Sequence, residues 1–524
     1  MDLFPHFYLS YNELSPEQKS CFSYCAVFPK DHEIVVEELI RLWIAQGYVR
    51  PRRRGECLEL VGLEYFNNLA MRSFFQEIRK GTYSGHEFMK CKMHDIVHDF
   101  ARFLTKNECH VLDGIGGNLL SERARHLTIL EGTEETFSSS AFDLGRLRSL
   151  FAFSRGRVPQ DLFRGLNCVR TLTLSHCQLR EVPTKVGSLV HLRHLDLSWN
   201  PFETLPEAIC DLYYLETLDI SYCRKLSCLP KRIEGLVHLK HLFNHNTYEL
   251  LQMQQGLGKL TSLCSLTSFI ASNNSVDLAI LKDLKQLERL YVDIHGKGDF
   301  GSAELGKKIY LREMLLRFSD EAHSEGTPSW IQTMEPPPNL QQLALVTYPG
   351  TQLPSWLVTE TLISSLTKLF IVEPRNISSL PTLWKLSSLE ELRLEYVEEL
   401  EYLGKEFFGI TLSKFESSSS TEAVAFPNLR KLHFLKFPNW TNWEDLSEED
   451  EKVVVSIMPC LEELEIEACD ELKGLPHRIL GKMSSLKSLK VQHCNKLRDR
   501  YSNKTGDDWL KISSRIPRIH ISQY

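Results

Sequence analysis

Hydrophobic positions along most of the chain recur in the phrase LxxLxL, where x marks a position open to polar residues. Clear copies begin at Leu147, Val169, Leu192 and Leu215, spaced by the roughly 20–29 residues that are typical of leucine-rich repeats. Each copy predicts a short strand whose apolar side chains enter a core that only stacked neighbours complete. Further copies begin at Leu239, Leu263, Leu287, Leu311, Leu340, Leu366, Leu389, Leu429, Leu461 and Leu486.

This pattern predicts a leucine-rich-repeat solenoid over residues 124–524, a horseshoe with a parallel inner sheet. Together with the helices expected before it, the fold class is α/β overall. Each strand should be followed by Asn or Cys, whose side chain bonds the turn backbone between coils. We interpret the residues at that place as structural: Asn200, Cys177, Cys223, Cys469 and Cys494.

Residues 1–105 lack the repeat period and show helical patterns followed by a hairpin. Ser15, Pro16 and Gln18 supply the N-cap, first-turn proline and capping-box partner of a helix that continues to Phe28. Further helices are expected at about 35–46, ended by Gly47, at about 56–72 and at about 95–104, with hairpin strands at 74–78 and 87–91. Helices followed by a β-wing predict a winged-helix domain at 1–105, joined to the repeats by a linker at 106–123.

Composition narrows the class of protein only modestly. The chain has 524 residues, 14 scattered cysteines and a formal net charge of −7, which fits a folded protein with reduced thiols. No apolar run is long enough to span a bilayer, and the N-terminus has no secretory pattern. We therefore expect a cytoplasmic protein. No nucleophile elbow, HExxH motif or acid-base constellation is present, so we expect no enzyme activity.

Two phrases in the first region carry a specific resemblance. They are the run from Cys21 to Asp31 with the following Leu39–Gly47, and the run Met93–Asp99. Together they resemble the winged-helix part of plant disease-resistance proteins of the nucleotide-binding leucine-rich-repeat family, most closely the coiled-coil type. The resemblance implies an immune receptor that switches between ADP-bound and ATP-bound states. In that family the Met-His-Asp motif, here Met93, His94 and Asp95, senses the nucleotide, with the histidine near the diphosphate of ADP.

The residues alone leave other roles open for His94. It is placed to cap the following helix, with Asp95 favourable at the positive end of that helix. His94 and His98 lie four residues apart, the spacing of two metal ligands on one helix face, but a third ligand is missing from the pattern. We therefore predict no metal site.

The chain departs from the family in having no GxxxxGK[ST] loop. The nearest match, Gly256-Leu-Gly258-Lys259, lacks the spaced first glycine and the final Ser or Thr, and falls inside a repeat. We expect the nucleotide-binding core to be missing, through truncation or because the chain is a fragment. ADP or ATP would then bind a full-length family member and not this chain alone.

Charges between the strand leucines are candidates for partner binding, since exposed strand positions are where repeat proteins usually recognise ligands. They alternate in sign by block, which favours complementary partners, although a solvated face would have the same composition. The candidates are Glu390, Glu391, Arg430, Lys431, Glu462, Glu463, Glu465, Lys487 and Lys490.

Two further segments have two interpretations each. The segment Trp440–Trp443 is either an exposed aromatic anchor or, as we favour, packing beneath a long insertion. Arg50–Arg54 beside a winged helix suggests phosphate contacts, but a solvated loop explains it more simply, and we expect no nucleic-acid partner.

These observations favour an intracellular plant immune receptor whose repeats sense a pathogen effector or a guarded host protein. The winged helix would relay the signal to a nucleotide-binding domain, within the same molecule or in trans. The alternative is a stand-alone repeat scaffold, acting as a decoy or regulator of full-length receptors without nucleotide binding.

Overall fold

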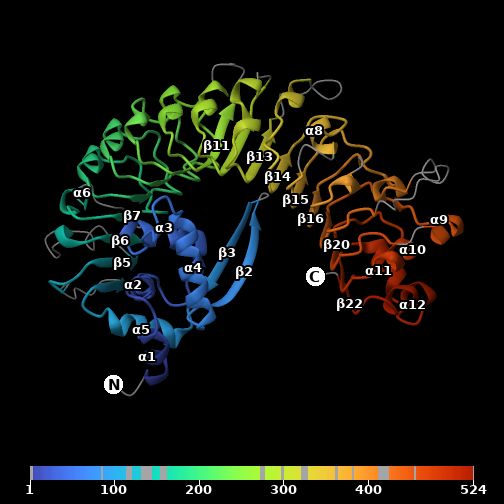
Figure 1. Ribbon diagram of the computed structural model, residues 1–524, viewed down its shortest axis with the longest axis horizontal. Coiled ribbons are helices and arrows are strands. Elements are labelled where there is room, and N and C mark those ends of the chain that lie inside the picture. Colours follow the sequence, from blue (N-terminus) through green and yellow to red (C-terminus); the bar gives the residue numbers. More distant parts are fainter. Residues whose placement is uncertain are drawn as a thin grey trace. The chain divides into compact units, whose positions relative to one another are not determined.

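The computed structural model divides the chain into two compact units, Met1–Ser268 and Phe269–Tyr524 (Figure 1). The structure describes residues 4–83, 86–113, 121–131, 144–153, 162–271, 278–296, 300–319, 329–359, 364–380, 383–410, 424–453 and 456–522. None of the helices in these ranges is long and apolar enough to cross a membrane.

The first unit opens with five helices and a small antiparallel sheet in the strand order β1-β3-β2. The predicted capping box is present: the Gln18 backbone N–H donates to Ser15 Oγ and the Ser15 N–H to Gln18 Oε1, each at 3.2 Å. Gly47 ends a helix at φ 79°, a conformation that glycine adopts without strain. The elements are α1 (Pro5–Asn12), α2 (Pro16–Tyr24), η1 (Cys25–Val27), β1 (Ile34–Val35), α3 (Val36–Gln46), α4 (Leu58–Met71), β2 (Gln76–Tyr83), β3 (His86–Lys92) and α5 (Asp95–Leu104).

The helical part of the first unit differs in detail from the sequence expectation. Helix α1 was not predicted; its residues Phe7 and Tyr8, and Phe4 at its N-cap, pack around the buried ring of Phe100 on α5. The helix expected to reach Phe28 ends at Tyr24 and continues as the short 3-10 helix η1. The hairpin strands are longer than the pattern indicated, because their polar outer positions hide the period of the strand.

The rest of the first unit is a parallel sheet in which each repeat adds one strand. Its register is continuous, so that Leu150, Leu172, Leu195, Leu218 and Leu242 stand side by side. Strands and short helices are β4 (Cys109–Asp113), β5 (His126–Glu131), η2 (Leu144–Arg146), β6 (Ser149–Ala152), α6 (Leu162–Gly165), β7 (Thr171–Thr173), η3 (Thr184–Ser188), β8 (His194–Asp196), η4 (Glu207–Asp211), β9 (Thr217–Asp219), η5 (Ile233–Gly235), β10 (His241–Phe243), η6 (Gln255–Lys259) and β11 (Ser265–Ala271).

Strand β4 lies inside the segment 106–123 that the sequence predicted to be a linker. It pairs in parallel with β5 through Cys109–His126 and its neighbours. The sheet therefore starts before residue 124. The LxxLxL phrase misses this strand because Asn107 and His110 stand at the first two leucine positions, and only Leu112 fits the phrase.

The second unit has the same repeat of one parallel strand per coil, with longer strands. Register pairs join β12 through β16, then β18, β20, β21 and β22, all in parallel, while β17 and β19 form a separate pair. Its elements are η7 (Ile280–Asp283), β12 (Arg289–Ile294), η8 (Phe300–Ala303), η9 (Leu305–Lys307), β13 (Glu313–Phe318), η11 (Ser329–Thr333), β14 (Gln342–Val346), α8 (Ser355–Val358), β15 (Lys368–Val372), η12 (Leu383–Lys385), β16 (Glu391–Glu395), β17 (Tyr402–Leu403), η13 (Lys405–Phe408), β18 (Lys431–Leu435), β19 (Asn442–Trp443), α9 (Glu448–Val453), β20 (Glu463–Glu467), α10 (His477–Lys482), β21 (Ser488–Gln492), α11 (Asn495–Tyr501), α12 (Asp507–Ser513) and β22 (Arg518–Ser522).

Parallel strands alternating with short helices confirm the predicted α/β leucine-rich-repeat class. The Asn and Cys positions after the strands are buried and bond backbone between coils, as expected. Asn200 Nδ2 donates to the carbonyls of Leu174 and Leu197 at 2.8 and 2.9 Å, and Cys223 Sγ donates to the Leu197 carbonyl at 3.2 Å.

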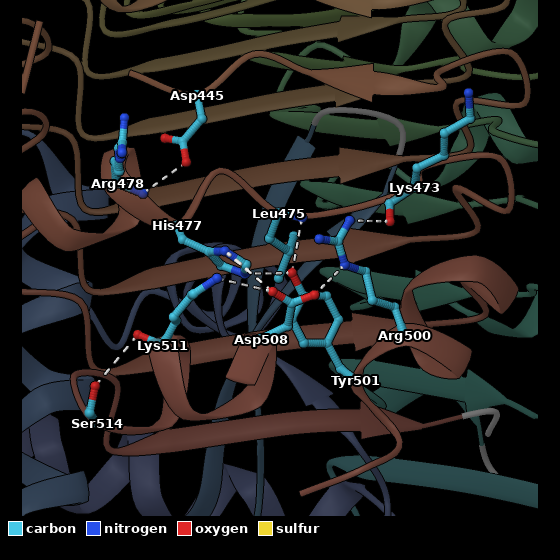
Figure 2. Close-up of polar contacts among 10 residues, drawn as sticks. All are labelled: Asp445, Lys473, Leu475, His477, Arg478, Arg500, Tyr501, Asp508, Lys511 and Ser514. Atoms are coloured by element: carbon cyan, nitrogen blue, oxygen red, sulfur yellow. Dashed lines mark hydrogen bonds and ion pairs between the residues drawn. The ribbon is translucent and has the colours of Figure 1, made fainter. Parts of the chain in front are cut away.

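A polar network supports the last repeats of the second unit (Figure 2). His477 Nε2 lies 2.8 Å from Tyr501 Oη, which also accepts the Leu475 backbone N–H at 3.2 Å. Arg500 Nε donates to Asp508 at 2.7 Å. These contacts tie α10, α11 and α12 together at a position where no further strand follows β22 within the described residues.

Candidate functional site

The Met-His-Asp motif lies at the start of α5. Met93 is buried in the core of the first unit, whereas His94 and Asp95 are exposed. His94 is the N-cap residue, and its Nδ1 accepts the backbone N–H of Ile96 at 3.3 Å. The helix-capping role is therefore present. The nucleotide-sensing role of Met93, His94 and Asp95 stays a prediction, for which the exposed ring and the positive helix end are favourable.

His98 does not accompany His94 as a ligand. Its side chain is buried, and Nε2 lies 2.8 Å from the Phe28 carbonyl. Burial lowers the pKa of His98, which keeps the ring neutral beside that carbonyl. Within the described residues no group of three His, Cys, Asp or Glu side chains is arranged to hold a metal ion.

The helices of the first unit contact the strand positions between the leucines of β5 to β8 in a buried polar junction. The centre is Ser149, whose Oγ lies 3.0 Å from Tyr24 Oη, Gln46 Nε2 and His126 Nδ1. Gln46 Nε2 also donates to Thr171 Oγ1 at 2.9 Å. Helix α3, which ends at Gln46, lies beside β7 in Figure 1.

Hydrogen-bond chemistry limits the proton arrangements at this centre. The Ser149 oxygen has two acceptor lone pairs and one proton. Gln46 Nε2 can only donate, so the Ser149 proton goes either to Tyr24 Oη or to His126 Nδ1. Burial raises the pKa of Tyr24 and lowers the pKa of His126 to about 3, so both side chains are neutral in either arrangement.

Two backbone contacts extend the junction. Thr128 Oγ1 donates to the Val27 carbonyl at 2.5 Å, and Arg170 donates from a terminal guanidinium nitrogen to the Gln46 carbonyl at 2.6 Å. The last contact ties the C-terminal end of α3, where free carbonyls accumulate, to a repeat cation. Because a buried polar group without a partner costs about 1–3 kcal/mol, these contacts make the docking of the helices specific.

A second part of the junction lies toward β10. Glu59 on α4 lies 3.5 Å from His241 Nε2, and Arg41 on α3 lies with its guanidinium carbon 4.7 Å from the centre of the Phe243 ring. Between α3 and the strands β7 to β9 the junction leaves a cavity of about 480 Å³.

The predicted partner-binding charges of the second unit follow the strand register. Glu391, Lys431 and Glu463 stand opposite one another on β16, β18 and β20, and the next row brings His433, Glu465 and Lys490 together.

Many of these charges pair with each other, mostly across neighbouring strands. The nitrogen–oxygen distances are 3.4 Å for Arg430–Glu462, 3.3 Å for Lys487–Glu462, 2.5 Å for Lys490–Glu463 and 2.7 Å for His433–Glu465. Glu390 lies just before β16 and is exposed. The face is therefore an internally compensated ladder, and its role in partner binding stays a prediction.

The remaining segments singled out in the sequence have structural roles. Trp440 and Trp443 are buried and pack against Phe434 in tilted and edge-to-face contacts, which confirms packing and excludes the exposed anchor. Residues Arg50–Arg54 are exposed in a loop, where Arg52 pairs with Glu64 at 2.9 Å. Gly256 and Gly258 lie in η6, so they form no phosphate loop.

Sequence reasoning missed the junction. Only one signal was available, the polar Gln46 at the end of an otherwise apolar helix face. Ser149, His126 and Arg170 occupy the variable positions of the repeat phrase, where the pattern does not distinguish a solvated residue from a docked one.

Comparison with known proteins places both parts of the chain. Residues 146–509 match the leucine-rich repeat region family, and residues 27–101 match the disease resistance protein winged helix domain. A relative from Arabidopsis thaliana that is named for disease resistance is 29% identical over 509 residues, covering 90% of this chain and 34% of that protein. RGA4 of Solanum bulbocastanum, likewise named, is 31% identical over 502 residues, covering 93% and 45%. The chain thus spans less than half the length of these relatives.

Among solved structures, a leucine-rich-repeat protein of Leptospira interrogans matches with a TM-score of 0.51 at 20% identity. The match covers 78% of this chain and 92% of that chain. At this identity the likeness concerns the fold alone.

Proposed function

The chain belongs to the plant disease-resistance proteins that combine a winged helix with leucine-rich repeats, and we propose that it is the sensing and restraining part of an intracellular immune receptor. The observation that carries this proposal is the buried junction around Ser149, through which α2 and α3 are bonded to the first repeats. A signal received on the repeats therefore has a direct physical route to the winged helix.

The proposed mechanism is a shift between two states. In the resting state the junction holds the winged helix against β5 to β8, with His94 presented at the exposed start of α5. A pathogen effector or guarded host protein that binds the repeats changes the receptor only if it prefers one state. The charge ladder on β16 to β21 is the proposed recognition face, because charges held in register offer a fixed pattern to a partner.

The nucleotide enters this proposal through the family and not through this chain. His94 Nδ1 already accepts the Ile96 N–H, so its Nε2 is the atom that would donate to a diphosphate. ADP would be held mainly by a nucleotide-binding domain in the same molecule or in trans, with the start of α5 closing the site. The proposed location is the cytoplasm, and the proposed role is that of a receptor and not an enzyme.

The test is Asp95→Val in a full-length receptor that contains this chain. We expect cell death without effector, because losing the carboxylate at the positive helix end loosens the resting state. Expression in leaf tissue with an ion-leakage assay measures it, with Asp99→Val on the same helix as the matched control. An inert Asp95→Val receptor at normal protein level would contradict the role of Met93, His94 and Asp95.

The stand-alone scaffold makes a different prediction for native tissue. An immunoblot against the repeats would show a band near 60.6 kDa if the chain acts by itself. A much larger band would support the receptor.

A further inference from the structure

The cavity at the junction has a wall from each side of the first unit. Helix α3 and the preceding segment contribute Phe28, His32, Glu33, Glu38 and Arg41, and the repeats contribute residues of β6 to β10 and of the loops that follow the strands. Its volume of about 480 Å³ exceeds what a few ordered waters need, since one water takes about 30 Å³.

The lining of the cavity is strongly acidic. Four carboxyl groups line it, those of Glu33, Glu38, Asp196 and Asp219, against the single guanidinium of Arg41. Asp196 and Asp219 each use Oδ1 to accept the backbone N–H two residues ahead, of Ser198 at 2.9 Å and of Ser221 at 2.8 Å. These bonds, with a further one from the Ser198 side chain to Asp196, fix both carboxyl groups in the cavity wall.

Burial favours the neutral forms of the titratable side chains in this lining. It raises the pKa of Asp196, helped by the neighbouring Asp219 and Glu38, and it also raises the pKa of Glu38. It lowers the pKa of His194 to about 3, so that this ring adds no positive charge. An entering cation would favour the ionised carboxylates.

The lining side chains of His194 and Thr173 are 3% and 6% exposed. His194 Nδ1 and Thr173 Oγ1 have no hydrogen-bond partner within the described residues. Buried polar atoms normally have a hydrogen-bond partner. A ring nitrogen and a hydroxyl without partners, next to two carboxyl groups, can together accept hydrogen bonds from a ligand with several N–H donors.

An aromatic ladder borders the cavity on the repeat side. The Trp199 indole, which is 42% exposed, is stacked between Tyr222 at 3.8 Å and His176 at 4.8 Å between ring centroids. Trp199 and His176 both line the cavity and both have φ of 59°, a conformation unusual for residues other than glycine. Both faces of the Trp199 ring are therefore covered by neighbouring rings of the repeats.

We infer that this cavity binds a guanidinium group, which donates to Asp196, Asp219, His194 Nδ1 and Thr173 Oγ1. A guanidinium is planar, always charged and has five N–H donors, which matches several acceptors in a cavity that the rings of Phe151 and Phe153 also line. An ammonium ion has only three donors and no flat face. Anions are disfavoured by the carboxyl groups. This inference goes beyond the proposed function, because it requires neither a nucleotide nor an immune role.

The guanidinium has two sources, an arginine side chain of a partner polypeptide or a free small molecule. Calorimetric titration of the whole chain with capped Gly-Arg-Gly and with arginine amide separates them. A tighter tripeptide points to a polypeptide, and equal affinities point to a small molecule. Citrulline amide, the neutral isostere, and capped Gly-Lys-Gly are the matched control ligands, and they need no protein variant.

The variants are chosen to keep the fold. Asn at positions 196 and 219 retains the Oδ1 acceptors, so the double change Asp196→Asn/Asp219→Asn removes charge only, and we expect at least about tenfold weaker binding. Asp211→Asn, at an exposed site in η4, should leave the affinity unchanged. Binding by the parent chain should release protons and tighten as the pH rises, because the pKa of Asp196 is raised and an entering cation favours the ionised carboxylate.

Saturable binding of either arginine probe that is lost in the double Asn variant supports the site. The inference is overturned if citrulline amide or Gly-Lys-Gly binds as tightly as its arginine counterpart. It is equally overturned if neither arginine probe binds, or if the double Asn variant binds as the parent does while retaining the parent's circular dichroism.

Discussion

The strands of the two units present the same leucines inward but very different residues between them. On β5 to β8 of the first unit those positions hold Ser149, Thr171 and His126, which are buried and bonded to the winged helix. On β16 to β21 of the second unit they hold charged residues such as Glu463 and Lys490, which are partly exposed and paired with each other. One backbone architecture thus supports a docked face and an open face.

The difference shows that the fold and the binding properties of the sheet face depend on separate positions of the repeat. Leucines at the fixed places of the repeat form the core in both units, while the variable places decide whether the sheet face is covered by protein or by water. Small hydroxyl groups and neutral histidines suit a dry interface, where each polar atom needs a partner. Paired carboxylates and ammonium groups suit a wet one.

The largest effect should be shared by both units. Leu195 and Leu464 are both fully buried strand leucines, one in each unit, so Leu195→Ala and Leu464→Ala should each cost about 2–5 kcal/mol of unfolding free energy. Urea unfolding measures the loss. A harmless change at either position would break the view that the two units share one type of core.

The sequence predicts the fold much further than it predicts the junction between the helices and the repeats. The spacing of the leucines predicts nearly every strand from β6 onward, and the Ser15 capping box predicts the start of α2. These signals are reliable because few other residue types can take the same positions. Strand β4 and helix α1 escape the pattern, since tertiary packing around Phe100 and pairing with β5 stabilise them. The junction escapes it because a serine such as Ser149 is equally common on solvated strands.

The next effect is a pH dependence of the stability of the first unit. His126 and His194 are buried in the first unit with pKa values lowered to about 3, so the folded state keeps them neutral. Unfolded histidine binds a proton below about pH 6.5. Stability should therefore fall as the pH drops through that value, by roughly 2 kcal/mol per histidine between pH 7 and pH 5.

Urea midpoints followed by hydrogen exchange in each unit measure this pH effect. His126→Phe should be destabilised by loss of the Ser149 contact, but it should show a flatter pH dependence than the parent. An unchanged slope would contradict a buried neutral His126.

A smaller effect tests the junction itself. Gln46→Ala removes the donor to Ser149 and Thr171 and should cost about 1–3 kcal/mol, because buried acceptors lose their partner. Gln492→Ala on β21, at a partly exposed strand position, is the matched control and should stay within about 0.5 kcal/mol. Chemical denaturation of both variants gives the comparison, and equal losses would mean that the junction contributes nothing specific.

The smallest effect belongs to the open face. Lys490 contacts Glu463 and Glu465 at 2.5 and 3.9 Å, yet Lys490→Ala should cost only about 0–1 kcal/mol, because exposed ion pairs are offset by solvation and side-chain entropy. That loss should shrink further in 1 M salt, where the screening length is about 3 Å. The Gln46→Ala loss should persist in the same salt, since its hydrogen bonds are buried and uncharged. If salt abolished the effect at Gln46 and left the effect at Lys490, the assignment of dry and wet faces would have to be reversed.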